Sequence, residues 1–222
     1  MMRLAIPCVL VAVVLAAGAA HAQMGWRIAP NIVVVSAERD ARLALVDEAI
    51  AFWNGTLQEI GSGLRLGPVT RVVQPIPEGA LQSLSMAVLA NPRGPIDAPE
   101  GLRDLPGDLT VFLAKSEFVS FAGPFLADQK RVVGIRPADR LPLTYPDVMR
   151  NVIAHELGHA IGLGHNADPT KLMCGRPAPC RPDAFHSNEP RIFPLTDDDR
   201  RRLRALYPPD WKAVARIAGG RA

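Results

Sequence analysis

The sequence has little excess charge of either sign. Its 25 Lys and Arg residues stand against 22 Asp and Glu residues, which leaves a formal net charge of +3. A nucleic-acid-binding domain usually concentrates positive charge on one face, so this balance argues against nucleic acid as a partner. The one dense basic run, at residues 200–204, directly follows three acids at residues 197–199. Acid first and base later is the order that a helix dipole favours, so we interpret this stretch as a solvated helix face.

Long apolar segments are also scarce, and the only one lies at the start of the chain. It follows the basic Arg3, runs from Leu4 to Ala20, and ends in Ala20-His21-Ala22, a small-residue cleavage pattern. Its apolar core of about 14–17 residues is short for a membrane span, which needs about 20. We therefore interpret residues 1–22 as a cleaved signal peptide, with an uncleaved membrane anchor as the alternative. The sequence thus predicts a secreted or periplasmic protein without an integral membrane segment after cleavage.

Aromatic residues make up only 5% of the chain, whereas proline is frequent, with 21 residues. So many prolines argue against a helical bundle and predict a loop-rich domain. The length of 222 residues suits one domain with a proper core. We assign this domain to residues 23–209 and a C-terminal tail to residues 210–222.

Strand and helix patterns are mixed along the domain. Residues 74–108 contain six prolines and are expected to be mostly loop. Because the helix predicted at 146–162 follows all of the predicted strands, the order of strands and helices predicts an α+β domain. Apolar runs predict strands at 32–35, 64–73, 109–113, 119–122 and 131–135, and apolar spacings of three and four predict helices at 43–60, 146–162 and 196–207.

Three histidines that lie close together in the sequence carry the chemistry: His155, His159 and His165. Residues four apart lie on one face of an α-helix, so His155 and His159 can point toward a single cation. His165 lies six residues beyond His159, and a straight helix would direct it elsewhere. Gly162 can adopt the left-handed conformation that ends a helix, and that turn would return His165 as a third ligand. Three protein ligands and an open fourth position are typical of a catalytic zinc ion.

Glu156 adjoins the first histidine and is not needed as a ligand itself. A carboxylate in this place can accept a proton from a zinc-bound water and later deliver it to a leaving amine. The pattern thus predicts one zinc ion and the hydrolysis of a peptide bond. Two other interpretations stay open: three histidines in ordinary core or surface positions, or a zinc site without catalysis.

The segment from His155 to His165 resembles the zinc motif of the metzincin metallopeptidases, and the residues C-terminal to it narrow the resemblance to the matrixins. Seven residues separate His165 from Met173, which is similar to the matrixin approach to a turn with a methionine beneath the metal. The acidic start and the leucines of the C-terminal helix are similar to the last helix of that family. The clear resemblance covers residues 146–173 and 195–209.

The resemblance implies a metzincin-like, zincin-type fold, with a twisted mixed sheet, an active-site helix and a small C-terminal subdomain. It also implies that substrate lies extended in a flat cleft, along the edge strand of the sheet. Met173 would support the site as a hydrophobic contact and would not bind the metal. We place the edge strand at Val119, Ser120, Phe121 and Ala122.

Other features depart from the matrixin pattern or match it less specifically. Matrixins usually carry a propeptide whose cysteine caps the zinc, and no such motif lies between residue 22 and the first strand, so this form of latency is not expected. The second, structural zinc of animal matrixins needs upstream histidines, and residues 23–154 contain none. We therefore predict a single zinc ion, and calcium sites are not identifiable. Asp198 and Asp199 match family acids that tie the last helix to the fold, although ordinary helix-start acids would look the same.

The chain has three cysteines, of which Cys8 would leave with the signal peptide. An exported protein meets an oxidising compartment, where the remaining pair, Cys174 and Cys180, would usually be bridged. We predict this disulfide, with free thiols or a thiolate on the metal as alternatives. The pair lies in the loop that walls the main specificity pocket in the matrixins. His186 of the same loop is interpreted as a surface histidine.

These patterns predict a secreted, monomeric zinc metalloendopeptidase. It would hydrolyse proteins or peptides through a zinc-bound water that Glu156 activates. A processing enzyme with one partner is a narrower form of the same hypothesis. A non-catalytic zinc-binding adhesion or interaction module with the same fold is the alternative, and the intact combination of Glu156 with three ligands argues against it.

Overall fold

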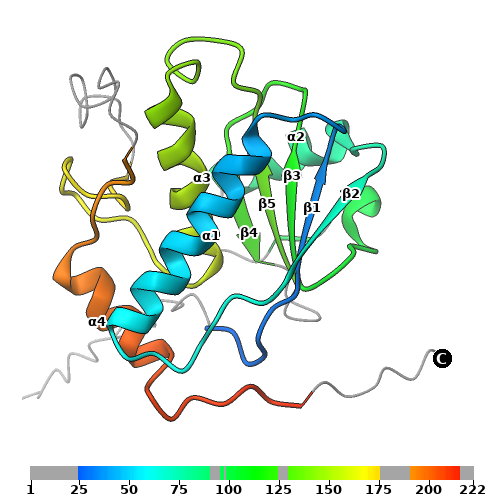
Figure 1. Ribbon diagram of the computed structural model, residues 1–222. Coiled ribbons are helices and arrows are strands. Elements are labelled where there is room, and N and C mark those ends of the chain that lie inside the picture. Colours follow the sequence, from blue (N-terminus) through cyan, green and yellow to red (C-terminus); the bar gives the residue numbers. More distant parts are fainter. Residues whose placement is uncertain (1–24, 91–95, 98, 125–129, 176–190, 216–222) are drawn as a thin grey trace, which may run out of the picture.

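The computed structural model describes residues 25–90, 96–97, 99–124, 130–175 and 191–215. A five-stranded sheet in the order β2-β1-β3-β5-β4 forms its centre (Figure 1). Four strands run parallel, and β4 is antiparallel to its neighbour β5. The mixed sheet and its helices confirm the predicted α+β fold. The strands are β1 (Ile32–Ser36), β2 (Val69–Val73), β3 (Leu109–Leu113), β4 (Phe121–Pro124) and β5 (Arg131–Ile135).

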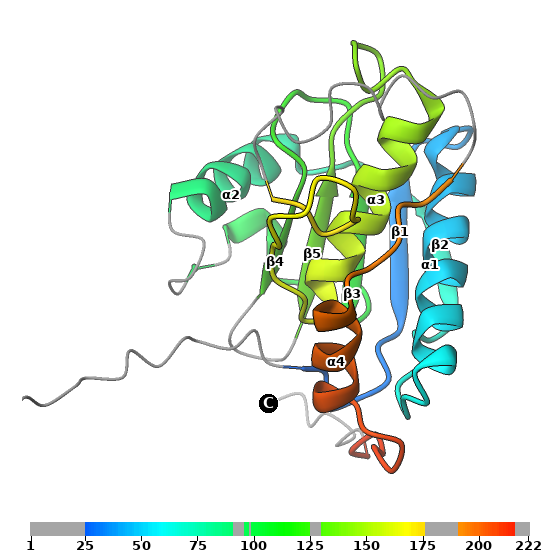
Figure 2. The ribbon, with the colours of Figure 1, turned by 90° about the vertical axis from the view of Figure 1, so that its left-hand side faces the viewer.

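Helices cover both faces of the sheet (Figures 1 and 2). Successive strand residues point to opposite faces, so Val34 packs in the core with α1 and α3, whereas its neighbour Val35 packs in the core with α2. Burial on both faces explains why the central strands are nearly continuous apolar runs. No helix in the described residues combines the length and apolarity that a membrane span requires. The helices are α1 (Arg42–Glu59), α2 (Glu78–Ala90), the 3₁₀-helix η1 (Glu100–Leu102), α3 (Pro146–Ala160) and α4 (Asp197–Leu206).

The prediction that residues 74–108 are mostly loop is wrong over α2. Pro77 precedes the first residue of this helix and Pro92 follows its last, so no proline interrupts it. Leu81 and Leu84 lie one turn apart and are buried against the sheet. Proline is compatible with a helix start because the first N–H groups of a helix lack helical partners anyway. The prolines therefore bound a helix that the composition of the whole segment conceals.

The strand predicted at 64–73 is shorter in the structure. Its first half, with Leu64 and Leu66, is buried in the core but is not a strand. β2 begins only after Pro68, which has no N–H group to donate to a neighbouring strand. Pro68 still takes part in the fold, because its carbonyl accepts a hydrogen bond from the Ile32 N–H at 3.1 Å.

The position of α3 depends on α1 and α4. Trp53 of α1 is fully buried, and its indole Nε1 donates to the Ala154 carbonyl of α3 at 2.9 Å. The smaller helix α4 lies near the C-terminal end of α3, as Figure 2 shows. The predicted helix at 196–207 is confirmed, and it begins with a capping box in which Thr196 and Asp199 exchange side-chain and backbone hydrogen bonds. The chain after α3 thus closes on the end of the helix that carries two of the three histidines.

Candidate metal centre

Three imidazole rings converge beside the C-terminal half of α3. Nε2 of His159 lies 3.0 Å from Nε2 of His155 and 3.0 Å from Nε2 of His165, and the remaining pair of Nε2 atoms is 3.2 Å apart. His155 and His159 are half-buried, whereas His165 is exposed. Within the described residues, the group that could hold a metal ion consists of these three histidines. Neither Glu156 nor Cys174 belongs to it.

The other ring nitrogens fix the tautomers of the first two histidines. Nδ1 of His155 lies 2.8 Å from the Leu172 carbonyl, and Nδ1 of His159 lies 2.9 Å from the Leu163 carbonyl. A carbonyl oxygen only accepts, so both Nδ1 atoms carry a hydrogen, and in the neutral form of each ring the lone pair is then on Nε2. Burial lowers the pKa of His159 to about 4, with a contribution from His165, so this ring is neutral at neutral pH.

This donor set fits a zinc ion. Three nitrogens bound at 2.0–2.1 Å to one tetrahedral zinc would lie about 3.3 Å from one another. The observed Nε2 separations of 3.0–3.2 Å are close to that value. Lone pairs of neutral rings that point at a common centre repel one another unless a cation lies between them. Three nitrogen ligands leave a fourth position for water or substrate, which is the composition of a catalytic zinc site.

A glycine turn brings the third histidine back, as the sequence predicts. Gly162 has a φ of 101°, a value that residues with a Cβ rarely adopt. The Leu163 N–H donates to the Gly158 carbonyl at 3.0 Å and the Gly162 N–H donates to the His159 carbonyl at 3.0 Å. These two bonds form a Schellman motif, which ends α3 and reverses the chain. The reversal places His165 opposite the two helical ligands.

Asn166 holds the segment after His165. Its backbone N–H donates to the Met173 carbonyl at 2.8 Å, and its carbonyl accepts from the Gly175 N–H at 2.9 Å. Its side-chain amide donates to the Asp199 carboxylate of α4 at 3.0 Å. The same carboxylate oxygen accepts from the Thr196 N–H at 3.0 Å. Asp199 therefore ties the last helix to the loop that follows the third histidine.

Asp199→Ala is expected to lower the free energy of unfolding by about 2 kcal/mol, because it removes half of a capping box and leaves the Asn166 amide without its acceptor. The matched control is Asp198→Ala. Asp198 is exposed and pairs with Arg201 across one helical turn, so its loss is expected to cost well under about 1 kcal/mol. Urea unfolding of the two variants measures the difference, and equal losses would contradict the special place of Asp199.

Met173 packs against α3, the helix that carries His155 and His159. It is fully buried, and a Cβ added at Gly158 would lie only 2.5 Å from its sulfur. The same added Cβ would lie 2.8 Å from the ring of Trp53. Gly158 therefore permits Met173 and Trp53 to pack directly against the backbone of α3, one residue before His159. The described contact of Met173 near the centre is this packing against α3, and its role as a hydrophobic support stays a prediction.

Glu156 and Cys174 both lie near the centre but differ in what they can do. Glu156 follows His155 on α3 and is only 8% exposed. A buried carboxylate beside a ligand can exchange a proton with a reactant in the site. Cys174 is buried, and its sulfur lies 3.5 Å from the Gly175 carbonyl. It is not part of the histidine group, so the structure gives no support to a Cys174 thiolate on the metal.

The edge of the sheet lies next to this centre. β4 is an edge strand of the described sheet, and α3 packs against β4 and β5. Of the predicted edge segment, Phe121 and Ala122 lie in β4, whereas Val119 and Ser120 precede it. The predicted segment is thus shifted by two residues toward the N-terminus. The metal centre and an edge strand are brought together by the packing of α3.

Three further residues of the site, Gly158, Asn166 and Gly175, were not predicted from the sequence. A Cβ added at Gly175 would lie 3.1 Å from the His165 side chain, so this glycine lets the ring of the third histidine pack against backbone. Glycine in a helix is about 1 kcal/mol less favourable than alanine. Gly158, which lies within α3 near its C-terminal end, is therefore a usable signal of close packing. Asn166 carries no comparable signal, because its partner on α4 is distant in the sequence.

Several predicted features lie outside the described residues. These are the signal peptide at residues 1–22, Cys180 of the predicted disulfide, and His186. The bridge between Cys174 and Cys180 and the surface position of His186 therefore stay predictions.

Comparisons with known proteins agree with this geometry. Residues 143–208 match the family model described as matrixin. Human matrix metalloproteinase-20 is 40% identical over 58 residues, which are 26% of this chain and 10% of that protein. Human matrix metalloproteinase-27 is 39% identical over 56 residues, 25% of this chain and 9% of that protein. The chain therefore spans about a tenth of the length of these two curated relatives.

A solved structure is also similar in outline. Archaemetzincin from Methanopyrus kandleri has a TM-score of 0.46 and 18% sequence identity, and the match covers 83% of this chain and 96% of that chain.

The helix with two histidines, the glycine turn and the returning third histidine define a metal site of the zincin class. Residues 143–208, which contain this site, are similar to the matrixin family model. The match begins just before α3 and ends after α4, so it contains the three histidines, Glu156 and Met173 together.

Proposed function

We propose that the protein is a zinc-dependent metalloendopeptidase that hydrolyses peptide bonds in proteins or peptides. The convergence of three Nε2 atoms within 3.0–3.2 Å carries the proposal, because it offers one cation three nitrogen ligands. Glu156, buried beside the first of them, supports a hydrolytic role in place of a purely structural site. His155, His159 and His165 would hold the ion.

The chemistry assigns one task to each group. A zinc ion bound here would lower the pKa of a water molecule and polarise the scissile carbonyl. The Glu156 carboxylate accepts a proton from the attacking water as the new carbon–oxygen bond forms. It then delivers that proton to the nitrogen of the leaving amine as the carbon–nitrogen bond breaks. One water is consumed, and the carboxylate is regenerated.

The substrate would pair with the edge of the sheet. β4 has β5 on one side and forms an edge of the described sheet on the other. An extended peptide can add to such an edge through backbone hydrogen bonds, which give affinity with little dependence on sequence. Because α3 packs against β4, a peptide bound along this strand lies close to the histidines. Proteins or peptides with an extended segment are therefore the proposed substrate class.

Proteolysis tests this function directly. The purified protein is expected to cleave casein or gelatin, to lose this activity when a chelator removes the metal, and to regain it on addition of zinc. Gel electrophoresis and a quenched-fluorescent peptide library would follow cleavage and preference. Zinc binding without any cleavage across such a library would favour the alternative, a zinc-binding adhesion or interaction module.

We further propose that the protein is exported, acts as a monomer with one zinc ion, and carries a Cys174–Cys180 disulfide. Residues 1–22 match the pattern of a signal peptide, and export would expose the cysteine pair to oxidising conditions. The intact mass of protein recovered from outside the cytoplasm is expected to begin at Gln23 and to lack two hydrogens relative to the reduced form. A mass that includes residue 1, or two alkylated cysteines without reduction, would contradict these assignments.

A further inference from the structure

The turn between His159 and His165 contains consecutive backbone carbonyls that need hydrogen-bond donors. The last carbonyls of a helix have no helical partner, and a buried one without a hydrogen bond is costly. Backbone N–H groups of the turn satisfy the carbonyls of Gly158 and His159. The next three carbonyls, of Ala160, Ile161 and Gly162, accept hydrogen bonds from side chains instead. These side chains come from distant parts of the chain.

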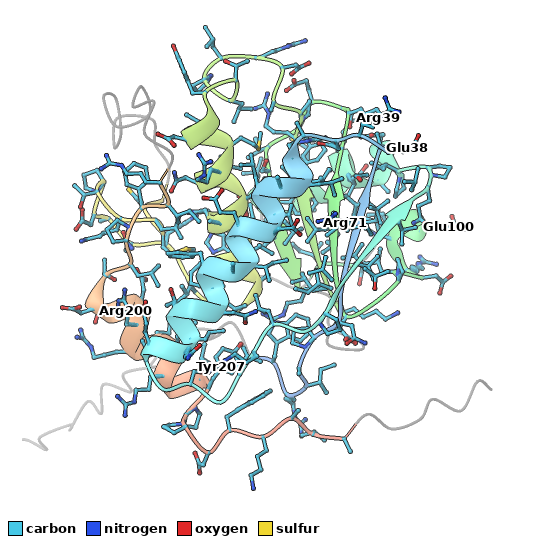
Figure 3. All side chains as sticks on the ribbon, viewed as in Figure 1. Glu38, Arg39, Arg71, Glu100, Arg200 and Tyr207 are labelled. Atoms are coloured by element: carbon cyan, nitrogen blue, oxygen red, sulfur yellow. The ribbon has the colours of Figure 1, made fainter. Side chains whose placement is uncertain are left out.

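Tyr207, which is labelled in Figure 3, directly follows α4. It makes the central contact of the turn. Its hydroxyl donates to the Ile161 carbonyl at 2.8 Å and accepts from the Trp26 backbone N–H at 3.0 Å. The ring is fully buried. Burial raises the pKa of the Tyr207 phenol above its ordinary value, so the hydroxyl keeps its hydrogen at neutral pH. One hydroxyl thus joins the N-terminal segment, the end of α4 and the turn.

Two donors meet at the Ala160 carbonyl. The indole Nε1 of Trp26 donates to it at 2.9 Å, and the Arg131 guanidinium donates to it as well. The guanidinium carbon lies 4.5 Å from the centre of the Trp26 ring, in cation–π contact. Trp26 itself is 2% exposed. This carbonyl would keep one donor if the other were removed.

The remaining contacts connect this series of carbonyls to the histidines His159 and His165. Arg202 of α4 donates through Nε to the Gly162 carbonyl at 2.9 Å. The next carbonyl, of Leu163, accepts from Nδ1 of His159. The three carbonyls that accept from Trp26, Tyr207 and Arg202 therefore directly precede, along the chain, the carbonyl that orients the ring of His159. Two residues later it carries His165.

We propose that Trp26, Arg131, Tyr207 and Arg202 are positioning residues, which hold the turn in the geometry that lets His165 join the other two histidines. This inference rests on the proposed zinc site. It adds that residues from both ends of the domain are needed to position the third histidine. Each of the four residues donates a side-chain hydrogen bond to a carbonyl of the turn. They act through backbone carbonyls, so their removal weakens the third ligand and leaves the identity of all three ligands unchanged.

Tyr207→Phe tests the inference in the full-length protein, because it removes only the hydroxyl. The matched control is Thr110→Val, since Thr110 of β3 is also fully buried and its hydroxyl also donates to a carbonyl, that of Pro106 at 2.6 Å. Zinc affinity, measured by competition with a metal-binding dye, is expected to fall about tenfold in Tyr207→Phe. It is expected to change less than about twofold in Thr110→Val, although both variants lose stability by thermal unfolding.

Trp26→Phe and Arg202→Met provide further variants if Tyr207→Phe does not fold. We expect about a threefold loss of zinc affinity in each, because Arg131 still donates to the Ala160 carbonyl and the other contacts of the turn stay in place. Unchanged zinc affinity in Tyr207→Phe, or in both replacement variants, would overturn the inference. An equal loss in Thr110→Val would do the same, because affinity would then follow general stability.

The zinc readout separates this inference from the proposed function. A wild-type protein that binds zinc but cleaves no peptide would refute the peptidase assignment and leave the positioning role to be judged by affinity alone. A wild-type protein that binds no zinc would refute both.

Discussion

Glu156→Gln is expected to abolish nearly all peptide hydrolysis while the protein still folds and binds zinc. Glutamine has almost the same shape as glutamate, so it fits the buried position after His155. It cannot accept a proton, however, and general acid–base catalysis of this kind contributes about 10²–10⁴-fold to a rate. We expect kcat to fall by at least that factor, and KM to change little.

The measurement compares kcat for a fluorogenic peptide with zinc content and unfolding temperature in the same preparation. The matched control is Glu59→Gln, because Glu59 of α1 is exposed and pairs only weakly with Arg200 at 3.2 Å. This variant should keep wild-type kcat. A Glu156→Gln protein with wild-type kcat would remove the carboxylate from the mechanism. Lost activity together with lost zinc would show a structural effect instead.

The metal centre could be predicted because its determinants are local in the sequence. His155 and His159 share a helix face, and Gly162 reverses the chain, so eleven consecutive residues contain all three histidines. Helix periodicity and the conformational freedom of glycine are sufficient to bring such residues together. Met173 was predicted from the resemblance alone. It is buried against Gly158, and its supporting role stays a prediction.

Features that depend on tertiary packing could not be predicted in the same way. The helix α2 was missed because its prolines lie at its borders, and because its apolar side chains pack on the second face of the sheet. The start of β4 was misplaced by two residues, since an edge strand has only one partner to fix its extent. The capping of α3 by Trp26 joins residues 134 positions apart, and no local pattern indicates such a contact.

Asp199 has a local role at the start of α4 and also a contact with a segment that is distant in the sequence. Its place three residues after Thr196 makes it the second member of the capping box that begins α4. The bond from Asn166 to the same carboxylate adds a tie to the metal-binding segment. The matrixin resemblance offered Asp198 as well, but that side chain is exposed and pairs within its own helix. The two acids therefore differ in the capping box, in exposure and in the partner across the fold.

Gly162→Ala is expected to weaken zinc binding by about 10–100-fold, and the nearby Gly164→Ala is expected to have almost no effect. A Cβ at a φ of 101° costs about 1–3 kcal/mol of backbone strain. The turn can relieve that strain only by changing the path between His159 and His165. The third histidine then leaves the position 3.0 Å from Nε2 of His159, and the ion keeps two firm protein ligands.

Gly164 is a close control because it lies in the same segment and has no comparable constraint. A Cβ added there meets no atom within 4 Å, and its φ lies outside the left-handed region. Competition for zinc by a chelating dye, with thermal unfolding of the metal-free proteins, measures both effects. Equal zinc affinity in the two variants would contradict this prediction. It would mean that other contacts of the loop, and not the left-handed turn, bring His165 to the metal.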